Sequence, residues 1–172
     1  MSRNGSGREE AMTADDALAG GSQLPVPDPA LERLERFVGT WALTGRTLGA
    51  DQDNVSGTTT FEWLSGGFFF QQRITLDFAG LKIESLELIG YDPETDTFPS
   101  TVYSNLSPTP LPYRWEVGED RLKITVSYGP IDATFNGAFS ADGETFGGRW
   151  RPNRGADESI NVPYDIDGRR AG

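Results

Sequence analysis

The sequence predicts an all-β domain, an antiparallel up-and-down β-barrel of about eight to ten strands with a short N-terminal helix. Gly39-Thr40-Trp41 follows a short helical pattern and begins a run of alternating apolar and polar residues. From there to Arg151 the chain divides into strand-like segments of regular spacing, and no helical pattern interrupts them. Such a meander most often closes into a barrel, because closure removes the exposed edges of an open sheet.

Length and composition restrict the possible classes of function. A chain of 172 residues suits one domain. Its formal net charge of −11 disfavours nucleic acid and anionic membrane surfaces as partners. The chain contains no Cys and no His, which excludes disulfides, thiolate or imidazole metal sites, His-ligated haem and Ser-His-Asp triads. We therefore expect no metal and no cofactor, and any proton transfer must use Asp, Glu, Lys, Tyr or water.

Residues 1–27 are rich in Gly, Ser, Ala and acidic residues and predict a disordered N-terminal tail, within which Met12 is an alternative start. The tail contains no apolar stretch that could form the core of a signal peptide. No window of the chain approaches the roughly 20 apolar residues that span a bilayer. We expect a soluble, cytoplasmic protein that does not associate with membranes.

A helix of about two turns is expected directly after the tail. Asp28 is suited to be its N-cap, and Pro29 suits the first helical position. Leu31, Leu34 and Phe37 recur at a spacing of three residues and form one narrow apolar stripe. This stripe favours a helix that closes one end of the barrel, and a helix packed outside the sheet is the alternative.

The barrel domain is expected over residues 28–166, with a C-terminal tail at 167–172. Residues 107–112 contain three prolines and predict a loop at the mouth of the barrel. The acidic turn around Asp51 and Asp53 lacks the pattern of a calcium loop, and Gly147-Gly148 is interpreted as a bend or bulge that helps the sheet to curl. After a first strand that begins behind Gly39, strands are expected at 58–63, 68–78, 82–91, 97–104, 113–117, 121–128, 132–140 and 145–151, and a short last one at 160–166.

Three blocks of sequence resemble the calycin superfamily, and most closely a bacterial family of lipocalin-like proteins known as domain of unknown function 1579. These blocks are residues 34–41, 63–73 and 89–95, and the resemblance extends over 31–151. It implies a lipocalin-like barrel with no established activity and no defined catalytic residues. The chain is also similar in outline to nitrobindin-type haem barrels, whose iron takes a His ligand that this chain lacks.

In lipocalin-like barrels the indole of the Gly-x-Trp motif packs at the closed end beneath an arginine of a late strand. The resemblance therefore places Trp41 at the closed end, with Arg149 or Arg151 over its ring. In this position Trp41 stabilises the barrel and does not contact a ligand.

A barrel of this size encloses more volume than its own side chains usually fill, so we expect an apolar cavity. An inward-facing Arg73 or Arg114 could bind a carboxylate. An inward-facing Glu62 or Glu87 would have its pKa raised by desolvation and could act as a general acid or base. The expected ligand-binding residues are Phe61, Trp63, Phe70, Arg73, Tyr91, Tyr103, Tyr113, Arg114, Trp115 and Phe135.

Three functions are compatible with this pattern. The first is a barrel that binds a small apolar molecule, either as a monomer or as a homodimer. The second is a cofactor-independent cyclase, isomerase or hydratase that folds a flexible polyketide- or terpenoid-like substrate. The third is a structural or partner-binding protein with a filled core. No catalytic residue can be assigned from the sequence.

Overall fold

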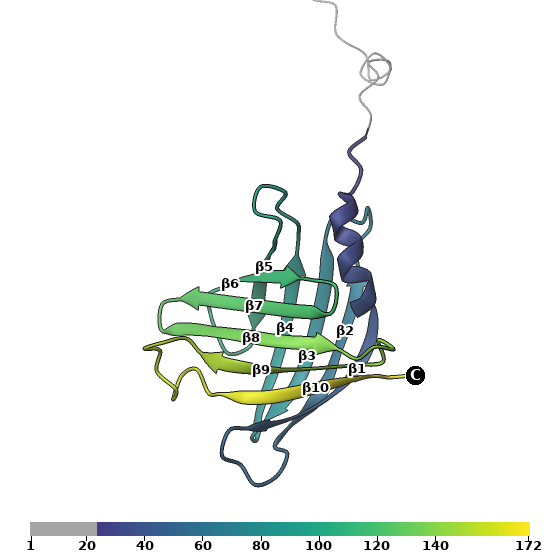
Figure 1. The fold of residues 1–172 in the computed structure, drawn as a ribbon. Helices are drawn as coiled ribbons and strands as arrows, with labels where there is room; N and C mark the ends of the chain where they lie inside the picture. Colours follow the sequence, from purple (N-terminus) through teal and green to yellow (C-terminus); the bar gives the residue numbers. More distant parts are fainter. Residues whose placement is uncertain (1–23) are drawn as a thin grey trace, which may run out of the picture.

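The computed structural model describes residues 24–172, so most of the tail expected at 1–27 lies outside the described residues. One helix and ten strands make up this region (Figure 1). In chain order they are η1 (Pro29–Phe37), β1 (Gly39–Thr47), β2 (Val55–Trp63), β3 (Phe70–Phe78), β4 (Leu81–Ile89), β5 (Phe98–Ser104), β6 (Leu111–Val117), β7 (Arg121–Tyr128), β8 (Ile131–Phe139), β9 (Thr145–Pro152) and β10 (Tyr164–Arg170).

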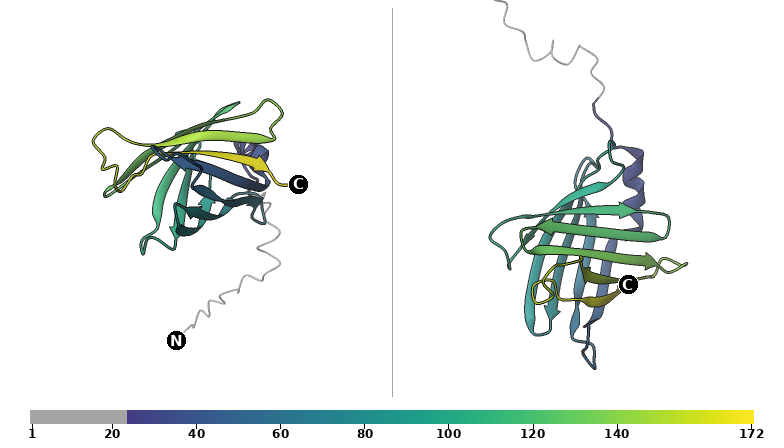
Figure 2. Two further views of the ribbon diagram at one scale, coloured as in Figure 1. Left: turned by 90° about the horizontal axis from the view of Figure 1, so that it is seen from below. Right: turned by 60° about the vertical axis from the view of Figure 1, so that its left-hand side comes forward.

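The strands form a closed antiparallel barrel, which confirms the predicted fold class. Each strand pairs with its neighbours in sequence, and β1 pairs with β10 to close the sheet. The closing register sets Trp41 opposite Arg170 and Thr47 opposite Tyr164. In Figure 1, β6 to β10 cross in front of β2 to β4, and Figure 2 shows the barrel from two further sides.

The two ends of the barrel differ in their connections. The connections at 48–54, 79–80, 105–110, 129–130 and 153–163 lie at one end, which we call the open end. We call the other end, which η1 covers, the closed end. Arg33 of η1 donates a hydrogen bond to the carbonyl of Val117 (3.3 Å), and Arg36 donates one to the carbonyl of Glu119. The helix is thereby attached to the β6–β7 connection.

The helix begins and packs as its sequence predicts. The Asp28 side chain accepts a hydrogen bond from the backbone N–H of Ala30 (2.8 Å), and Pro29 takes the first helical position. Leu31, Leu34 and Phe37 are buried. The helix is a 3₁₀ helix, in which side chains three residues apart lie in line, so the spacing of three keeps the whole apolar stripe on one side.

Aromatic rings fill the closed end below the cavity. The Phe37 ring centroid lies 4.8 Å from that of Phe139, 5.5 Å from that of Phe61 and 5.6 Å from that of Trp115. Trp41 is fully buried beside them, and its indole N–H donates to the carbonyl of Phe37 (2.7 Å). The prediction that the helix closes one end of the barrel is thus confirmed.

The arginine over Trp41 is not the expected one. The guanidinium carbon of Arg170 lies 4.3 Å from the Trp41 ring centroid, whereas Arg149 is exposed and Arg151 pairs with Asp165 (2.6 Å). Strand periodicity explains the correction. Even-numbered residues of β9 and β10 face the barrel interior, so Arg149 and Arg151 face outward and Arg170 faces inward.

Several element boundaries differ from expectation; β4 ends at Ile89 and not at 91, and β6 begins at Leu111, inside the predicted loop at 107–112. The second strand begins at Val55 and the third at Phe70, and the last strand covers Tyr164–Arg170 instead of 160–166. Residues 167–170, assigned to a tail, therefore belong to the barrel, because all four pair with β1 and the first three also pair with β9. Gly147 and Gly148 lie inside β9 and pair in register with both β8 and β10.

Candidate functional site

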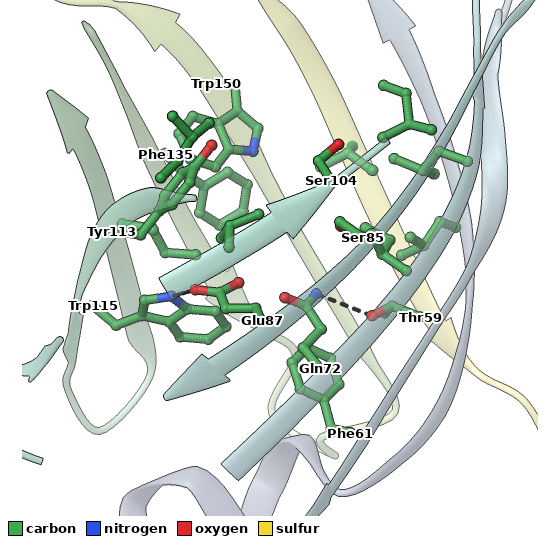
Figure 3. A pocket seen from close by; sticks show the side chains of 18 of the residues that line it. Thr59, Phe61, Gln72, Ser85, Glu87, Ser104, Tyr113, Trp115, Phe135 and Trp150 are labelled. Atoms are coloured by element: carbon green, nitrogen blue, oxygen red, sulfur yellow. Dashed lines mark hydrogen bonds between the residues drawn. The ribbon is translucent and has the colours of Figure 1, made fainter. Parts of the chain in front are cut away.

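A cavity of about 350 Å³ occupies the barrel between Phe37 at the closed end and the loops of the open end (Figure 3). Side chains from all ten strands line it, and most of them are apolar. Leu106 and Ser107 of the β5–β6 connection lie among them, which confirms the predicted mouth loop. The lining residues are Phe37, Leu43, Thr59, Phe61, Gln72, Ile74, Leu76, Ile83, Ser85, Glu87, Val102, Ser104, Leu106, Ser107, Leu111, Tyr113, Trp115, Leu122, Ile124, Ile131, Phe135, Phe146, Trp150, Tyr164 and Ile166.

One wall of the cavity is aromatic. The ring of Trp150 lies 5.5 Å from that of Phe135 and 6.1 Å from that of Tyr113, centroid to centroid. Within the described residues the hydroxyl of Tyr113 has no hydrogen-bond partner, and Figure 3 shows it at the cavity beside Phe135 and Trp150. This wall offers flat apolar surface and one free hydroxyl.

A polar cluster faces the cavity from the neighbouring strands β2, β3 and β4. Gln72 and Glu87 are register partners on β3 and β4, and their polar ends point toward one another in Figure 3. The amide nitrogen of Gln72 donates to the hydroxyl of Thr59 (3.0 Å), and Ser85 lies two residues from Glu87 on the same face. Apolar residues surround this cluster, so its donors and acceptors that have no protein partner are available to hydrogen-bond an occupant of the cavity.

Glu87 is held firmly at one of its two carboxyl oxygens. Oε1 accepts hydrogen bonds from the hydroxyl of Ser100 (2.5 Å) and from the indole N–H of Trp115 (2.7 Å). Oε2 has no hydrogen-bond partner within residues 24–172, and the side chain borders the cavity. The residue is only 7% exposed, which makes Glu87 a fixed carboxyl group with one oxygen free to meet a ligand.

Burial changes the acidity of the groups on the wall. Desolvation raises the pKa of Glu87 to about 7, although the hydrogen bonds from Ser100 and Trp115 act in the opposite direction. Desolvation, together with the nearby Glu87 carboxyl, raises the pKa of Tyr113 to about 12. Burial also raises the pKa of Tyr164. Glu87 can therefore give or take a proton near neutral pH, while both tyrosines stay neutral.

Of the two glutamates expected to face the cavity, Glu87 does so and its pKa is raised, whereas Glu62 faces outward. Glu62 is exposed on the outer face of β2 and accepts a hydrogen bond from the Gln71 amide (2.6 Å). The difference again follows from the alternation of side chains along a strand. Phe61 faces inward, and its neighbour Glu62 must face outward.

Neither predicted arginine reaches the cavity. Arg73 is exposed, because Gln72 and Ile74 on either side of it face inward. Arg114 is exposed as well, and it donates to the hydroxyl of Thr97 (2.6 Å) on the outer surface. Among residues 24–172, Glu87 is the only one with an acidic or basic side chain that lines the cavity.

The structure brings four of the ten predicted ligand-binding residues together on the cavity wall: Phe61, Tyr113, Trp115 and Phe135. The other aromatic residues lie elsewhere. Phe70 is fully buried in the core and packs against Trp63, with ring centroids 4.6 Å apart. Tyr91 donates to Asp96 (2.9 Å) near the closed end, and Tyr103 is 48% exposed.

Sequence reasoning did not single out Gln72, Thr59, Ser85, Trp150 or Tyr164 as parts of this wall. For Gln72 a signal was present, because a polar residue interrupts the apolar face of β3 between Phe70 and Ile74. The others carry no comparable signal, since their inward direction depends on the registers of separate strands.

The described residues contain neither a cluster of metal-binding side chains nor a membrane-spanning helix. No group of three or more His, Cys, Asp or Glu side chains in residues 24–172 is arranged to hold a metal ion. No helix in this region is long and apolar enough to cross a membrane.

Comparison with known proteins identifies a family and a similar fold. A model of the family described as "Protein of unknown function (DUF1579)" matches residues 26–142. The crystal structure of Rv2717c from M. tuberculosis is similar, with 11% sequence identity and a TM-score of 0.53, covering 85% of this chain and 99% of that chain. At this identity the likeness concerns the fold alone. No curated protein matches the chain.

Proposed function

We propose that this chain, which belongs to the DUF1579 family of proteins of unknown function, binds a small, largely apolar molecule in its barrel. The observation that carries the proposal is the cavity itself. Its volume of about 350 Å³ and its mainly apolar and aromatic wall match the usual properties of small-molecule sites. A few fixed polar groups, Glu87 and Gln72 foremost, would orient the molecule within it.

The surface of the open end supports access for an apolar molecule. A large exposed hydrophobic side chain lies in or directly beside each of the five connections at this end. These side chains place apolar surface at the open end, which lowers the cost of bringing an apolar molecule from water to the barrel. They are Leu48, Leu81, Leu106, Tyr128 and Ile160.

Binding of Nile red, a neutral fluorophore whose emission rises in apolar surroundings, tests this proposal. Ser85 faces the cavity, so Ser85→Phe should fill part of it and weaken Nile red binding by about tenfold or more. Leu86→Phe is the matched control, because Leu86 is the next residue on β4 and faces away from the cavity. Both variants are first compared with the parent protein by thermal unfolding.

The proposal fails if the folded protein does not bind Nile red. It fails also if the two phenylalanine variants bind the dye as tightly as the parent protein, because the dye is then bound outside the barrel.

One observation favours a second candidate function, a cofactor-independent cyclase, isomerase or hydratase. Glu87 has a pKa near neutrality in apolar surroundings, where a carboxylate is a stronger base than in water. A simple probe is 1,2-benzisoxazole: a carboxylate that removes its C3 proton breaks the N–O bond and releases 2-cyanophenolate. A general base at Glu87 predicts ring opening that increases as pH rises through about 7 and is absent in Glu87→Gln. An equal rate in both proteins excludes this role for Glu87.

A further inference from the structure

We infer that the cavity selects neutral molecules with an oxygen-bearing polar end, such as alcohols, over carboxylates of the same carbon skeleton. The inference rests on the proposed binding function and names the class of ligand. It comes from the single ionisable carboxyl on the cavity wall and from the absence of a basic side chain there among residues 24–172.

The groups around Glu87 are all neutral. Gln72 faces it from β3, Ser100 from β5 and Trp115 from β6, and Thr59 of β2 is hydrogen-bonded to Gln72. Along β4 itself, the inward neighbour is Ser85. Among residues 24–172, the other titratable side chains that line the cavity are Tyr113 of β6, whose pKa is about 12, and Tyr164 of β10, whose pKa burial also raises, so both stay neutral at physiological pH. None of these groups carries a positive charge that could balance a second negative charge.

A carboxylate in the cavity would therefore be buried beside an acidic group without a counter-ion. The guanidinium groups that could balance it, Arg73 and Arg114, lie outside the barrel. Either the ligand or Glu87 would have to take up a proton before both could be buried together, because two like charges in apolar surroundings repel strongly. A neutral ligand has no such requirement.

The same wall offers hydrogen bonds to a neutral oxygen. Oε2 of Glu87, the amide oxygen of Gln72 and the hydroxyl of Tyr113 have no hydrogen-bond partner within the described residues, and all three side chains border the cavity. An alcohol could donate to Oε2 or to the Gln72 oxygen and could accept from the Tyr113 hydroxyl. These contacts would leave fewer polar groups unpaired than an apolar occupant would leave.

Displacement of Nile red by decan-1-ol and by decanoate tests the inference. At about pH 8, where Glu87 is mostly ionised, decan-1-ol should bind at least about tenfold more tightly than decanoate. Between about pH 8 and pH 6 the decanoate affinity should rise by about tenfold, because Glu87 becomes protonated while decanoate stays ionised. The affinity of decan-1-ol should change by less than about twofold.

Variants at Glu87 separate the charge from the hydrogen bond. Glu87→Gln removes the charge, so the pH dependence of decanoate binding should disappear while decan-1-ol still binds. Glu87→Leu removes both, and decan-1-ol should bind about tenfold more weakly. Glu62→Gln is the matched control, because Glu62 is an exposed carboxyl on β2 and its loss should leave all affinities unchanged.

The outcomes distinguish the two levels of the argument. If Nile red binds in the cavity but both decyl compounds displace it equally at each pH, the inference is wrong and the binding function stands. If Nile red does not bind, the binding function itself fails. A pH dependence that persists in Glu87→Gln also overturns the inference, because another group must then cause it.

Discussion

The ring of Phe135 on β8 lies directly against the backbone of Gly148 on β9. A Cβ atom at position 148 would overlap this ring and would lie 2.7 Å from the carbonyl oxygen of Asn136. Phe135 also lines the cavity, so the absence of a side chain at Gly148 keeps the aromatic wall close to the sheet and the cavity open.

Gly148→Ala should consequently destabilise the protein by about 2 kcal/mol and weaken Nile red binding, because the Phe135 ring must move into the cavity. Urea denaturation and dye titration measure the two effects. Gly118→Ala is the control, since the nearest atom to its Cβ would be the Arg121 oxygen at an ordinary 3.5 Å. Equal stability of the two variants would show that the ring adapts without cost.

Arg170→Ala should lower the free energy of unfolding by about 2 kcal/mol. The guanidinium lies over Trp41 and donates hydrogen bonds to the carbonyls of Val38 (2.7 Å) and Arg36 (2.9 Å), which tie the last strand to the end of the helix. Arg169 is exposed on the same strand, so Arg169→Ala should change stability by less than about 0.5 kcal/mol. Matching urea midpoints for the two variants would contradict this role.

The raised pKa of Glu87 predicts that stability depends on pH in a defined window. The folded-state pKa of about 7 lies above the ordinary 4.5, so the folded protein binds more protons than the unfolded chain between these values. The contribution of neutral Glu87 is complete below about pH 4.5 and is lost as pH rises through 7, by about 3 kcal/mol in total.

Glu87→Gln isolates this effect, because its side chain stays neutral throughout. The variant should gain stability relative to the parent protein as pH rises from about 5 to about 8, with a difference of about 2.5 kcal/mol between the two ends. Denaturation at several pH values provides the measurement. A constant difference would mean that the Glu87 carboxyl titrates normally. Lowered carboxyl pKa values make stability depend on pH only in more acidic solution than the window of Glu87. These are the pKa values of Asp92, Asp96, Asp142 and Asp157.

Arg73→Ala and Arg114→Ala should leave Nile red binding unchanged within about twofold. Both guanidinium groups lie on the outer surface, although both were expected on sequence grounds to face a ligand. Titration of the dye against each variant measures this. A loss of affinity of the size expected for Ser85→Phe would place the dye on the outside of the barrel.

Features that depend on neighbouring residues were predictable. The N-cap at Asp28, the apolar stripe of Leu31, Leu34 and Phe37, and the alternation around Gln72 on β3 are all local patterns, and the structure contains them. The order of strands and turns then led to a closed barrel, because few other arrangements pair every strand of such a meander.

Features that join distant parts of the chain were not predictable in the same way. Arg149 and Arg170 are both arginines of late strands, and only the pairing of β10 with β1 places Arg170 over Trp41. Likewise, the sequence suggested Glu62 and Glu87 equally, and the registers decided that Glu87 faces inward. A shift of one residue in a strand reverses the direction of every side chain on it.

By itself, then, the amino-acid sequence determined the class of fold, the helix at one end and the exclusion of His- and Cys-based chemistry, since these follow from composition and local periodicity. The tertiary structure alone decided which side chains meet inside the barrel. Burial inside the barrel raises the pKa of Glu87, and the hydrogen bonds from Ser100 and Trp115 on two other strands occupy Oε1 and leave Oε2 free. That environment exists only once the barrel has closed.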